Sequence, residues 1–569
     1  MTLDRRSLLG WMGAGVAGST VATTAEARRV SQSVSFRHGV ASGDPAPRSV
    51  VFWTRVTPGD PGAGDIDVVL EVATDVDFAN VVRRSAGLRA RADRDFTVKH
   101  DLDGQGLEPG TDYFYRFLAG GVTSPVGRTR TLALGTLAEA RLAVVSCQLY
   151  PGGLFNAYDA VARLQQVDAV VHLGDYIYEY GGGPDDYGMA TGAALNRLPD
   201  PPHEIVSLDD YRRRHAQYKS DPDLQAAHAR APFICVWDDH EVTNDTWNTG
   251  AQNHQPATEG DFVTRKAAAL RAYFEWMPIR DPAPGGMQEA IQRSFHFGDL
   301  ASLMMVETRL QGRVRQLSYG SDMDFSTGPD GQPAPDVAAF EPLRHAEDRD
   351  LLGTPQREWL GRELTESKAA GRPWQILGNQ VVMARVAGPD IAAAATPAEI
   401  DAMLSGLSAE VRTQVEKAAG LFRHGLPFNL DSWDGYPAGR ERLYQTFKTA
   451  GVKPIVLAGD SHAFWINELK DDAGEHRAVE FGTSGISSPS PGDALGDFPL
   501  GAALAGTNPE VVFCDQRAKG FVLLTLTPDA ARADMMAVST VMARPYELRT
   551  LTSYALAAGP DATGALIGT

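Results

Sequence analysis

Apolar runs that end directly in clusters of polar residues recur along most of this chain. Four of them have the length and composition of β-strands: residues 142–147, 169–173, 233–237 and 454–458. Helix-like segments lie among them: residues 156–166, 224–228 and 262–276. This alternation over about residues 140–540 predicts a layered α/β domain, in which ligands bind beyond the carboxyl ends of strands.

The pattern between about residues 35 and 135 differs, because short β-rich runs alternate there with turns rich in Gly, Pro and Asp. Residues 107–116 resemble the corner at which a turn enters an aromatic strand in immunoglobulin and fibronectin folds. The pattern predicts an N-terminal β-sandwich of the immunoglobulin or fibronectin type. We expect it to have a structural or substrate-orienting role, since it contains no cluster of catalytic residue types.

Four further segments lie outside these two patterns or interrupt them. Residues 183–205 and 318–345 are rich in Gly, Pro and Asp, and we expect loops there. An Ala-rich helical stretch at 389–425 is a candidate cap over the site. Residues 541–569 are assigned to a C-terminal tail.

The first residues have the order of an export signal. Arg5 and Arg6 form a twin-arginine pattern, a mildly apolar stretch follows to about residue 22, and Ala25-Glu26-Ala27 is a cleavage site. Residues 1–27 are therefore predicted to engage the twin-arginine translocation machinery and to direct the protein to the periplasm or the medium. The alternative is an unrelated first helix with two arginines. The apolar stretch is too short for a permanent membrane anchor.

Net charge and cysteine content bear on which partners, substrates and ligands the protein can have. The 569 residues include 53 Lys and Arg against 72 Asp and Glu, a net charge of −19. This argues against a stable complex with nucleic acid, and an anionic substrate would need bound cations at the site. Cys235 and Cys514 lie inside apolar runs and are expected to be buried and inert, whereas Cys147 ends its run, where sites form.

The polar clusters after the four strand-like runs carry metal-binding residue types. Asp175 and Tyr178 belong to G-D-x-x-Y, in which a carboxylate can bridge two cations and a phenolate can bind Fe³⁺. Cys147 would be a soft thiolate ligand. Taken singly, the Asp and Tyr could be a turn residue and a packed ring, and the cysteine an inert thiol.

Two later clusters pair carboxylates with imidazoles. Asp239 and His240 stand in D-D-H-E, where the histidine suits proton transfer and the aspartate metal binding. Asp460 and His462 stand in G-D-S-H, and their spacing lets both address neighbouring metals. A helix cap and a serine turn are the alternatives for these two clusters. Jointly the four clusters are more specific than any one of them.

These clusters resemble the motifs of the calcineurin-like metallophosphatase superfamily, D-x-H, G-D-x-x-Y, G-N-H-[DE] and G-H-x-H. Cys147 stands where the first Asp is usual, Asp239 replaces the motif Asn, and Asp460 replaces the first His of the last motif. The histidine expected between them is also missing, and residues 377–383 occupy a similar place. These substitutions resemble the PhoD-type alkaline phosphatase and phosphodiesterase family. Further segments fit it as well, and the likeness extends beyond residue 525: residues 36–45, 237–242, 272–278 and 432–437.

The resemblance implies a mixed metal site with one Fe³⁺ and one or two Ca²⁺. By motif position the iron ligands are Cys147, Asp175, Tyr178 and His462. Asp175 also bridges to calcium, which Asp239 and Asp460 ligate. Asn244 and Gln380 are weaker candidates for contacts to the ligands or to the phosphate.

The implied function is an exported, metal-dependent phosphoesterase, which attacks phosphate monoesters, diesters or both with a metal-activated hydroxide or oxide. His240 is expected to protonate the leaving oxygen or to bind the phosphoryl group, and Glu241 to orient His240 or to cap local structure. The alternatives are a phospholipase D-type phosphodiesterase on the same scaffold and a non-catalytic exported binding protein.

Overall fold

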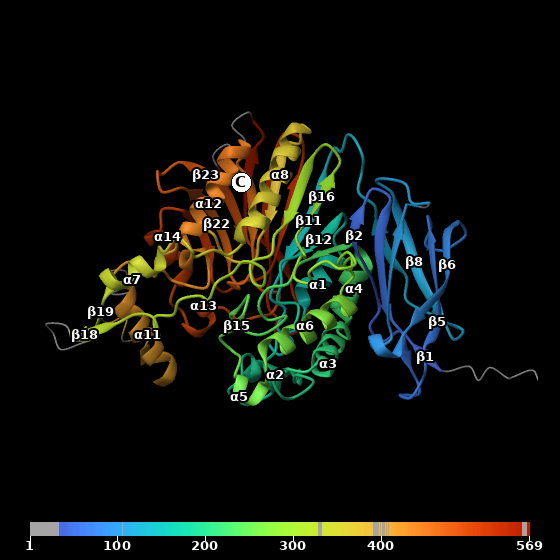
Figure 1. Cartoon of the computed structure of the whole chain (residues 1–569), viewed down its shortest axis with the longest axis horizontal. Coiled ribbons are helices and arrows are strands. Elements are labelled where there is room, and N and C mark those ends of the chain that lie inside the picture. The colour runs from blue at the N-terminus through green and yellow to red at the C-terminus, as the bar shows by residue number, and fades with distance from the viewer. Residues whose placement is uncertain are drawn as a thin grey trace, which may run out of the picture.

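The computed structural model describes residues 33–104, 106–327, 333–390, 409–559 and 566–568, with isolated positions between 391 and 408. The predicted signal, residues 1–27, lies outside the described residues. Two large mixed sheets, of ten and seven strands, dominate the described part. The N-terminal strands β5, β6 and β8 lie at one end of the long axis (Figure 1).

The ten-stranded sheet is parallel at its centre, where β11 (Ala140–Val145), β12 (Ala169–His172) and β13 (Phe233–Cys235) lie side by side. Antiparallel strands extend it beyond β11: β25 (Lys519–Leu526), β26 (Ala530–Val538), β27 (Leu548–Ala557) and β28 (Ile567–Gly568). Residues 548–557, which the sequence analysis assigned to a tail, are thus a strand of this sheet.

The seven-stranded sheet has the order β16-β17-β20-β21-β23-β22-β24. Its strands span Arg293–Phe297, Ala301–Met305, Trp374–Gly378, Ile455–Ala458, His476–Gly482, Phe464–Lys470 and Val511–Asp515, in that order. Successive residues of a strand face opposite sides. Leu303 and Leu457 accordingly join the core that also holds Val144 and Val171 of the other sheet, whereas Met304 faces a different core.

Helices cover the outer faces of both sheets (Figure 1). On the seven-stranded sheet, α8 (Gly353–Ala369) and α12 (Pro437–Ala450) bury Leu360 and Leu443 in the core that holds Met304, next to α14 (Leu500–Thr507). The ten-stranded sheet carries α1 (Asn156–Ala162), α3 (Leu208–Lys219), α4 (Pro222–Arg230) and α6 (Phe262–Trp276). The layered α/β arrangement predicted from the alternating pattern is therefore present.

The N-terminal part is strand-rich, as predicted, but it shares a sheet with the rest of the chain. Strands β2 (Val40–Ala46), β3 (Ser49–Arg55) and β7 (Thr97–Asp103) continue the ten-stranded sheet, because Gly43 of β2 pairs with Phe233 of β13. A Cβ at Gly43 would lie 2.5 Å from the carbonyl oxygen of Phe233, so only glycine allows this approach.

A smaller sheet packs against these strands and shares an apolar core with them. It contains β5 (Ile66–Ala73), β6 (Val81–Ala90), β8 (Asp112–Ala119), β9 (Val122–Thr123) and β10 (Gly127–Arg130). At the corner that the sequence singled out, the hydroxyl of Tyr113 accepts a hydrogen bond from the backbone N–H of Glu108 at 2.7 Å. A tyrosine that bonds back across a turn in this way fixes the entry of its strand.

The loop predictions were wrong for parts of both insertions. The first contains α2 (Met189–Leu195), and the second contains β18 (Phe325–Thr327), β19 (Pro333–Pro335) and α7 (Val337–Arg344). Helix α7 forms because Asp336 caps it and Phe340 is buried in a small apolar cluster. The predicted cap falls partly outside the described residues, and α11 (Ala409–Phe422) lies within it. Among the described helices, none is long and apolar enough to cross a membrane.

Candidate metal centre

The polar residues that follow β11, β12, β13 and β21 come together at the carboxyl ends of these strands. The turns there are unusual, because Cys147, Asp175, Asp460 and His462 have φ angles of 57° to 58°. Residues other than glycine rarely adopt such backbone angles, and strained turns of this kind concentrate at functional sites. The turns aim thiol, carboxylate and imidazole groups from both sheets into one place.

Cys147, Asp175 and His462 form one end of the centre, with potential ligand atoms all within 4.8 Å of one another. The hydroxyl of Tyr178 lies among them, 3.0 Å from Asp175 Oδ2 and 3.2 Å from His462 Nε2. His462 Nδ1 is 2.7 Å from the carbonyl oxygen of Pro489, which requires hydrogen on Nδ1 and leaves a lone pair on Nε2. We call these four side chains the thiol–phenol end.

Without a cation, the thiol–phenol end is held in its protonated form. Burial, and then the charge of Asp175, raise the pKa of the Cys147 thiol and of the Tyr178 phenol well above their ordinary values. The hydroxyl of Ser146 lies 3.1 Å from the Cys147 sulfur. A bound cation would oppose both effects, because coordination deprotonates thiols and phenols.

Asp238, Asp239 and Asp460 form the other end, which we call the carboxylate end, again with ligand atoms within 4.8 Å of one another. Asp175 and Asp239 also group with His240, so the two ends adjoin. Oδ1 of Asp175, Oδ2 of Asp238 and Oδ1 of Asp239 are buried and accept no hydrogen bond from the described residues. Buried carboxylate oxygens without a donor are costly, so this donor set fits oxygen-seeking cations.

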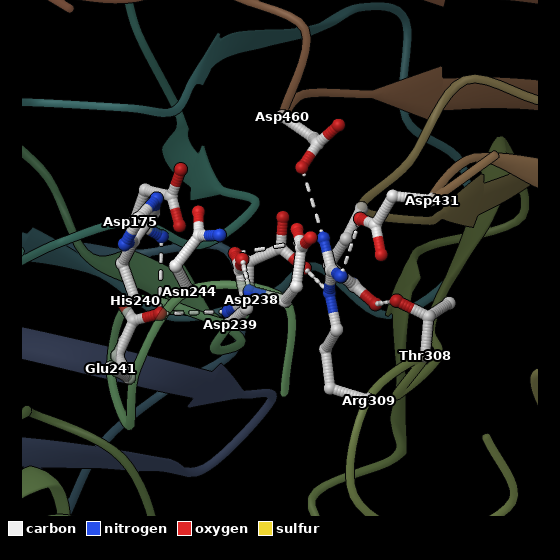
Figure 2. A network of polar contacts seen from close by, with 12 residues as sticks. Asp175, Asp238, Asp239, His240, Glu241, Asn244, Thr308, Arg309, Asp431 and Asp460 are labelled. Atoms are coloured by element: carbon white, nitrogen blue, oxygen red, sulfur yellow. Dashed lines mark hydrogen bonds and ion pairs between the residues drawn. The ribbon is translucent and has the colours of Figure 1, made fainter. Parts of the chain in front are cut away.

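Arg309 occupies the middle of the carboxylate end and was missed by the sequence analysis (Figure 2). Its fully buried guanidinium contacts Asp238 through Nε, Asp431 through Nη1 at 2.6 Å, and Asp460 through Nη2 at 2.9 Å. Asp239 Oδ1 lies 3.5 Å from Nη2. Arg309 follows the strand β17 as the predicted ligands follow theirs, so the same sequence signal was present.

His240 is positioned by Glu179, another residue that the sequence analysis did not select. Nδ1 of His240 is 2.7 Å from Glu179 Oε2, and the imidazole packs against the ring of Tyr178 at 4.2 Å between centroids. Burial by itself would lower the pKa of His240, but Asp239, Glu179 and Asp175 together raise it well above its ordinary value. Glu179 directly follows Tyr178 in the sequence, a hint that the G-D-x-x-Y motif extends by one residue.

Glu241 does not contact His240 through any hydrogen bond among the described residues. Its carboxylate instead accepts hydrogen bonds from the backbone N–H groups of Asp175 at 3.1 Å, Tyr176 at 2.5 Å and Asp238 at 2.7 Å. Glu241 was expected either to orient His240 or to cap local structure, and these contacts match the capping role. It ties together the turns that carry the two ends of the centre.

The two weaker candidates differ in position. Asn244 lines the cavity in front of the centre, and its Oδ1 accepts a hydrogen bond from Tyr180 at 3.1 Å. Gln380 is fully buried and bonds to the hydroxyl of Thr308 and the carbonyl of Val306, at 2.7 and 2.9 Å. Gln380 therefore does not reach the cavity, and its place is structural support behind the centre.

A cavity of about 720 Å³ opens onto both ends of the centre. The predicted ligands Asp175, Asp239, Asp460 and His462, with His240, form its polar wall. Val382, Val386, Phe428 and Trp465 also line it. No Lys or Arg is among the described residues that line this cavity. The positive charge that an anionic group requires here would therefore have to come from bound cations or from a protonated histidine of the lining.

Comparisons with known proteins agree over nearly the whole chain. The family described as PhoD-like phosphatase matches residues 142–535, and its N-terminal domain matches residues 21–133. The chain is 34% identical to a protein named Alkaline phosphatase D from Bacillus subtilis (strain 168), over 97% of this chain and 87% of that protein. A solved structure titled Structure of PhoD superposes with a TM-score of 0.74 at 31% identity, and covers 94% of this chain and 92% of that one.

These matches cover both sheets, the clusters that form the centre and the strand-rich N-terminal part. The chain thus belongs to the PhoD-like phosphatase family and is a phosphoric ester hydrolase.

Proposed function

We propose that this enzyme is exported and hydrolyses phosphate monoesters, diesters or both at the centre described above. In this proposal one Fe³⁺ is held by Cys147, Asp175, Tyr178 and His462, and one or two Ca²⁺ by Asp175, Asp239 and Asp460. The observation that carries it is the contrast in donor atoms. A thiol, a phenol and an imidazole join one carboxylate at one end, and at the other end the potential ligand atoms all belong to carboxylates. Iron suits the first set and calcium the second.

When bound, the cations would neutralise the phosphoryl group and lower the pKa of water from about 16 to near 7. The protein orients this chemistry through its fixed turns. Asp175 lies between the two ends, and Glu241 fixes the backbone of Asp175 and Asp238. Side chains held in this way need not reorganise during the reaction, which is the main contribution that a protein makes to electrostatic catalysis.

His240 is proposed to bind the phosphoryl group or to protonate the leaving oxygen. Its Nδ1 is engaged by Glu179, so only Nε2 can act on the substrate. Cations at the centre would offset the charges of Asp175 and Asp239, but Glu179 lies outside the proposed ligand set. Glu179 therefore continues to favour the protonated imidazole, which is the form that can donate a proton.

The decisive experiment combines elemental analysis with a visible spectrum of the exported enzyme. Iron and calcium are expected together, with a phenolate-to-iron absorption band that disappears in Tyr178→Phe. Zinc or manganese without iron and without colour would contradict the ligand assignment at the thiol–phenol end.

The role of His240 is tested separately. His240→Ala should lower turnover of p-nitrophenyl phosphate by about 10² to 10⁴-fold with unchanged metal content. His345→Ala, at an exposed histidine outside the cavity, is the matched control. Loss of iron from His240→Ala would show that the histidine is a metal ligand instead.

The export route and the division of the chain complete the proposal. Arg5 and Arg6 would direct the folded, metal-loaded protein to the twin-arginine machinery, and Arg5→Lys with Arg6→Lys should retain activity inside the cell. Residues 35–135 are proposed as an immunoglobulin-like domain and residues 140–540 as the catalytic domain. The corner at Tyr113 supports the first assignment.

A further inference from the structure

A second cavity, of about 570 Å³, adjoins the cavity of the metal centre. Residues that line both cavities form a neck between them: Asn244, Asp245, Phe428, Asn429 and Asp431. We call the cavity at the metal centre the first chamber and the other the second chamber. A phosphorus atom at the centre therefore has room for ester substituents on two sides.

The two chambers differ in chemistry. The first chamber has an apolar wall, formed by Val382, Val386 and Trp465. The second mixes amide and hydroxyl groups with apolar side chains and aromatic rings: Gln252, Gln316, Ser318 and Ser321 lie with Leu317, Leu430, Trp247 and Tyr319. Such a wall favours a substituent that carries hydroxyl groups, because each hydroxyl can find a partner.

Trp247 is held as a flat surface in the second chamber. Its indole Nε1 donates to the hydroxyl of Thr249 at 3.1 Å. The ring lies across Gly250, where a Cβ would come 2.6 Å from a ring atom. The short hairpin of β14 (Thr246–Trp247) and β15 (Gly250–Ala251) therefore orders the indole before any ligand arrives. A pre-ordered ring binds at a low entropic cost.

The second chamber offers no free positive charge among its described lining residues. Its one cationic side chain, Arg315, is paired with Asp322 at 2.5 Å. Asp245 and Asp431 line the neck, and the arginine that contacts Asp431 there, Arg309, is itself surrounded by carboxylates, so the neck likewise offers an anionic substituent no unpaired cation. The chemistry of the chamber thus favours a neutral substituent over one with a second phosphate.

We propose that the second chamber binds the non-leaving substituent of a phosphodiester, and that this substituent is uncharged, hydroxyl-rich and about the size of a sugar. The inference rests on the proposed function, because it places the reacting phosphorus at the metal centre. Trp247 is then a residue that determines specificity without acting on the reacting atoms.

The test uses esters that share p-nitrophenol as the leaving group and differ in the second substituent. They are the monoester, the methyl diester, a hexose diester and a diester whose second substituent bears another phosphate. The hexose diester is expected to exceed the methyl diester in kcat/KM by about tenfold, the size of effect that aromatic contacts produce. The phosphate-bearing diester should be no better than the methyl diester.

Trp247→Ala should abolish the advantage of the hexose diester and leave the monoester and methyl diester within about twofold of wild type. Trp247→Phe should retain most of the advantage. Trp359→Ala, at a half-buried tryptophan of α8 outside both chambers, is the control and should retain all of it.

Equal kcat/KM for the hexose and methyl diesters in wild type would overturn the inference, as would an unchanged advantage in Trp247→Ala. A preference for the phosphate-bearing diester would overturn the requirement for a neutral substituent. In each of these cases the monoester is still hydrolysed, and the proposed function stands. Failure of the fully metal-loaded enzyme to hydrolyse any of the four esters would overturn the proposed function and the inference together.

Discussion

The two ends of the centre reduce the free-energy cost of burying ionisable groups in different ways. At the thiol–phenol end burial keeps the thiol and the phenol protonated, and the Tyr178 hydroxyl lies 3.0 Å from Asp175 Oδ2 and 3.2 Å from His462 Nε2. At the carboxylate end the acids remain close together because Arg309 supplies a positive charge among them.

The difference shows what each end requires of a metal. The thiol–phenol end must lose protons before it can bind a cation tightly, which favours an ion of high charge. The carboxylate end already contains the positive charge of Arg309 and so accepts fewer additional positive charges, although burial and Asp238 still raise the pKa of Asp460 well above its ordinary value. One end is therefore expected to hold its metal firmly, and the other to exchange its metal with solution.

The change that breaks both ends at once is Asp175→Asn. Since Asp175 groups with Cys147 and His462 on one side and with Asp239 on the other, iron and calcium should both be lost. Activity on p-nitrophenyl phosphate should fall by about a thousandfold or more. Asp185→Asn, at an exposed aspartate, is the control. Full retention of either metal in Asp175→Asn would show that Asp175 does not bridge the ends.

Arg309→Met breaks the carboxylate end alone. Removal of the guanidinium leaves Asp238, Asp239 and Asp460 without their internal cation, whereas Asp431 keeps Arg313. The free energy of unfolding should fall by about 3 to 5 kcal/mol in the presence of a chelator. Added Ca²⁺ should restore part of that loss. Urea titrations with and without Ca²⁺ measure both effects. Arg532→Met, which removes a half-exposed ion pair with Asp534, should change stability by less than about 1 kcal/mol.

Cys147→Ser weakens only the thiol–phenol end. Iron occupancy after dialysis should fall and the visible band should shift, because a hydroxyl replaces a thiolate donor. Calcium content should remain near that of wild type. Cys514→Ser, at a buried free cysteine that belongs to no group of potential metal ligands among the described residues, is the matched control. An unchanged iron content and spectrum in Cys147→Ser would remove the cysteine from the ligand set.

The smallest expected effect is on the pH dependence of stability, and it concerns Lys219. Unlike Arg309, Lys219 is a buried cation that has no carboxylate partner among its described contacts. Lys219 lies 3.3 Å from His228 Nε2 and over the ring of Trp53, and burial lowers its pKa from 10.5 to about 7. Between those pH values the unfolded chain binds more protons, so the stability of wild type should rise with pH. The rise is at most about 1.4 kcal/mol per pH unit for one group.

Lys219→Met should lack that rise and should be more stable than wild type near pH 7. Unfolding titrations at pH 7, 8 and 9 compare the two slopes. A parallel pH dependence in both proteins would show that Lys219 remains charged in the folded state.

The strands that precede the predicted ligands, and the grouping of the polar clusters, could be predicted from the sequence, because both depend on local patterns. Each predicted ligand follows an apolar run, and the carboxyl ends of parallel strands meet. Contacts between distant residues have no such local signal. His240 bonds to Glu179 and not to its neighbour Glu241, since adjacent side chains point in different directions. The β17 run before Arg309 was not recognised as a strand that reaches the centre.

The sheet that the N-terminal part shares with the rest of the chain fixes the order in which its strands can pair during translation. Strand β2 is synthesised early, yet its neighbour β13 emerges from the ribosome only after the smaller sheet, β11 and β12. Until Phe233 arrives, one edge of β2 has unpaired backbone groups that can pair with another nascent chain. Dilution, chaperones or early contacts must shield that edge during translation. The N-terminal part of this enzyme therefore keeps an unpaired strand edge until β13 has been synthesised.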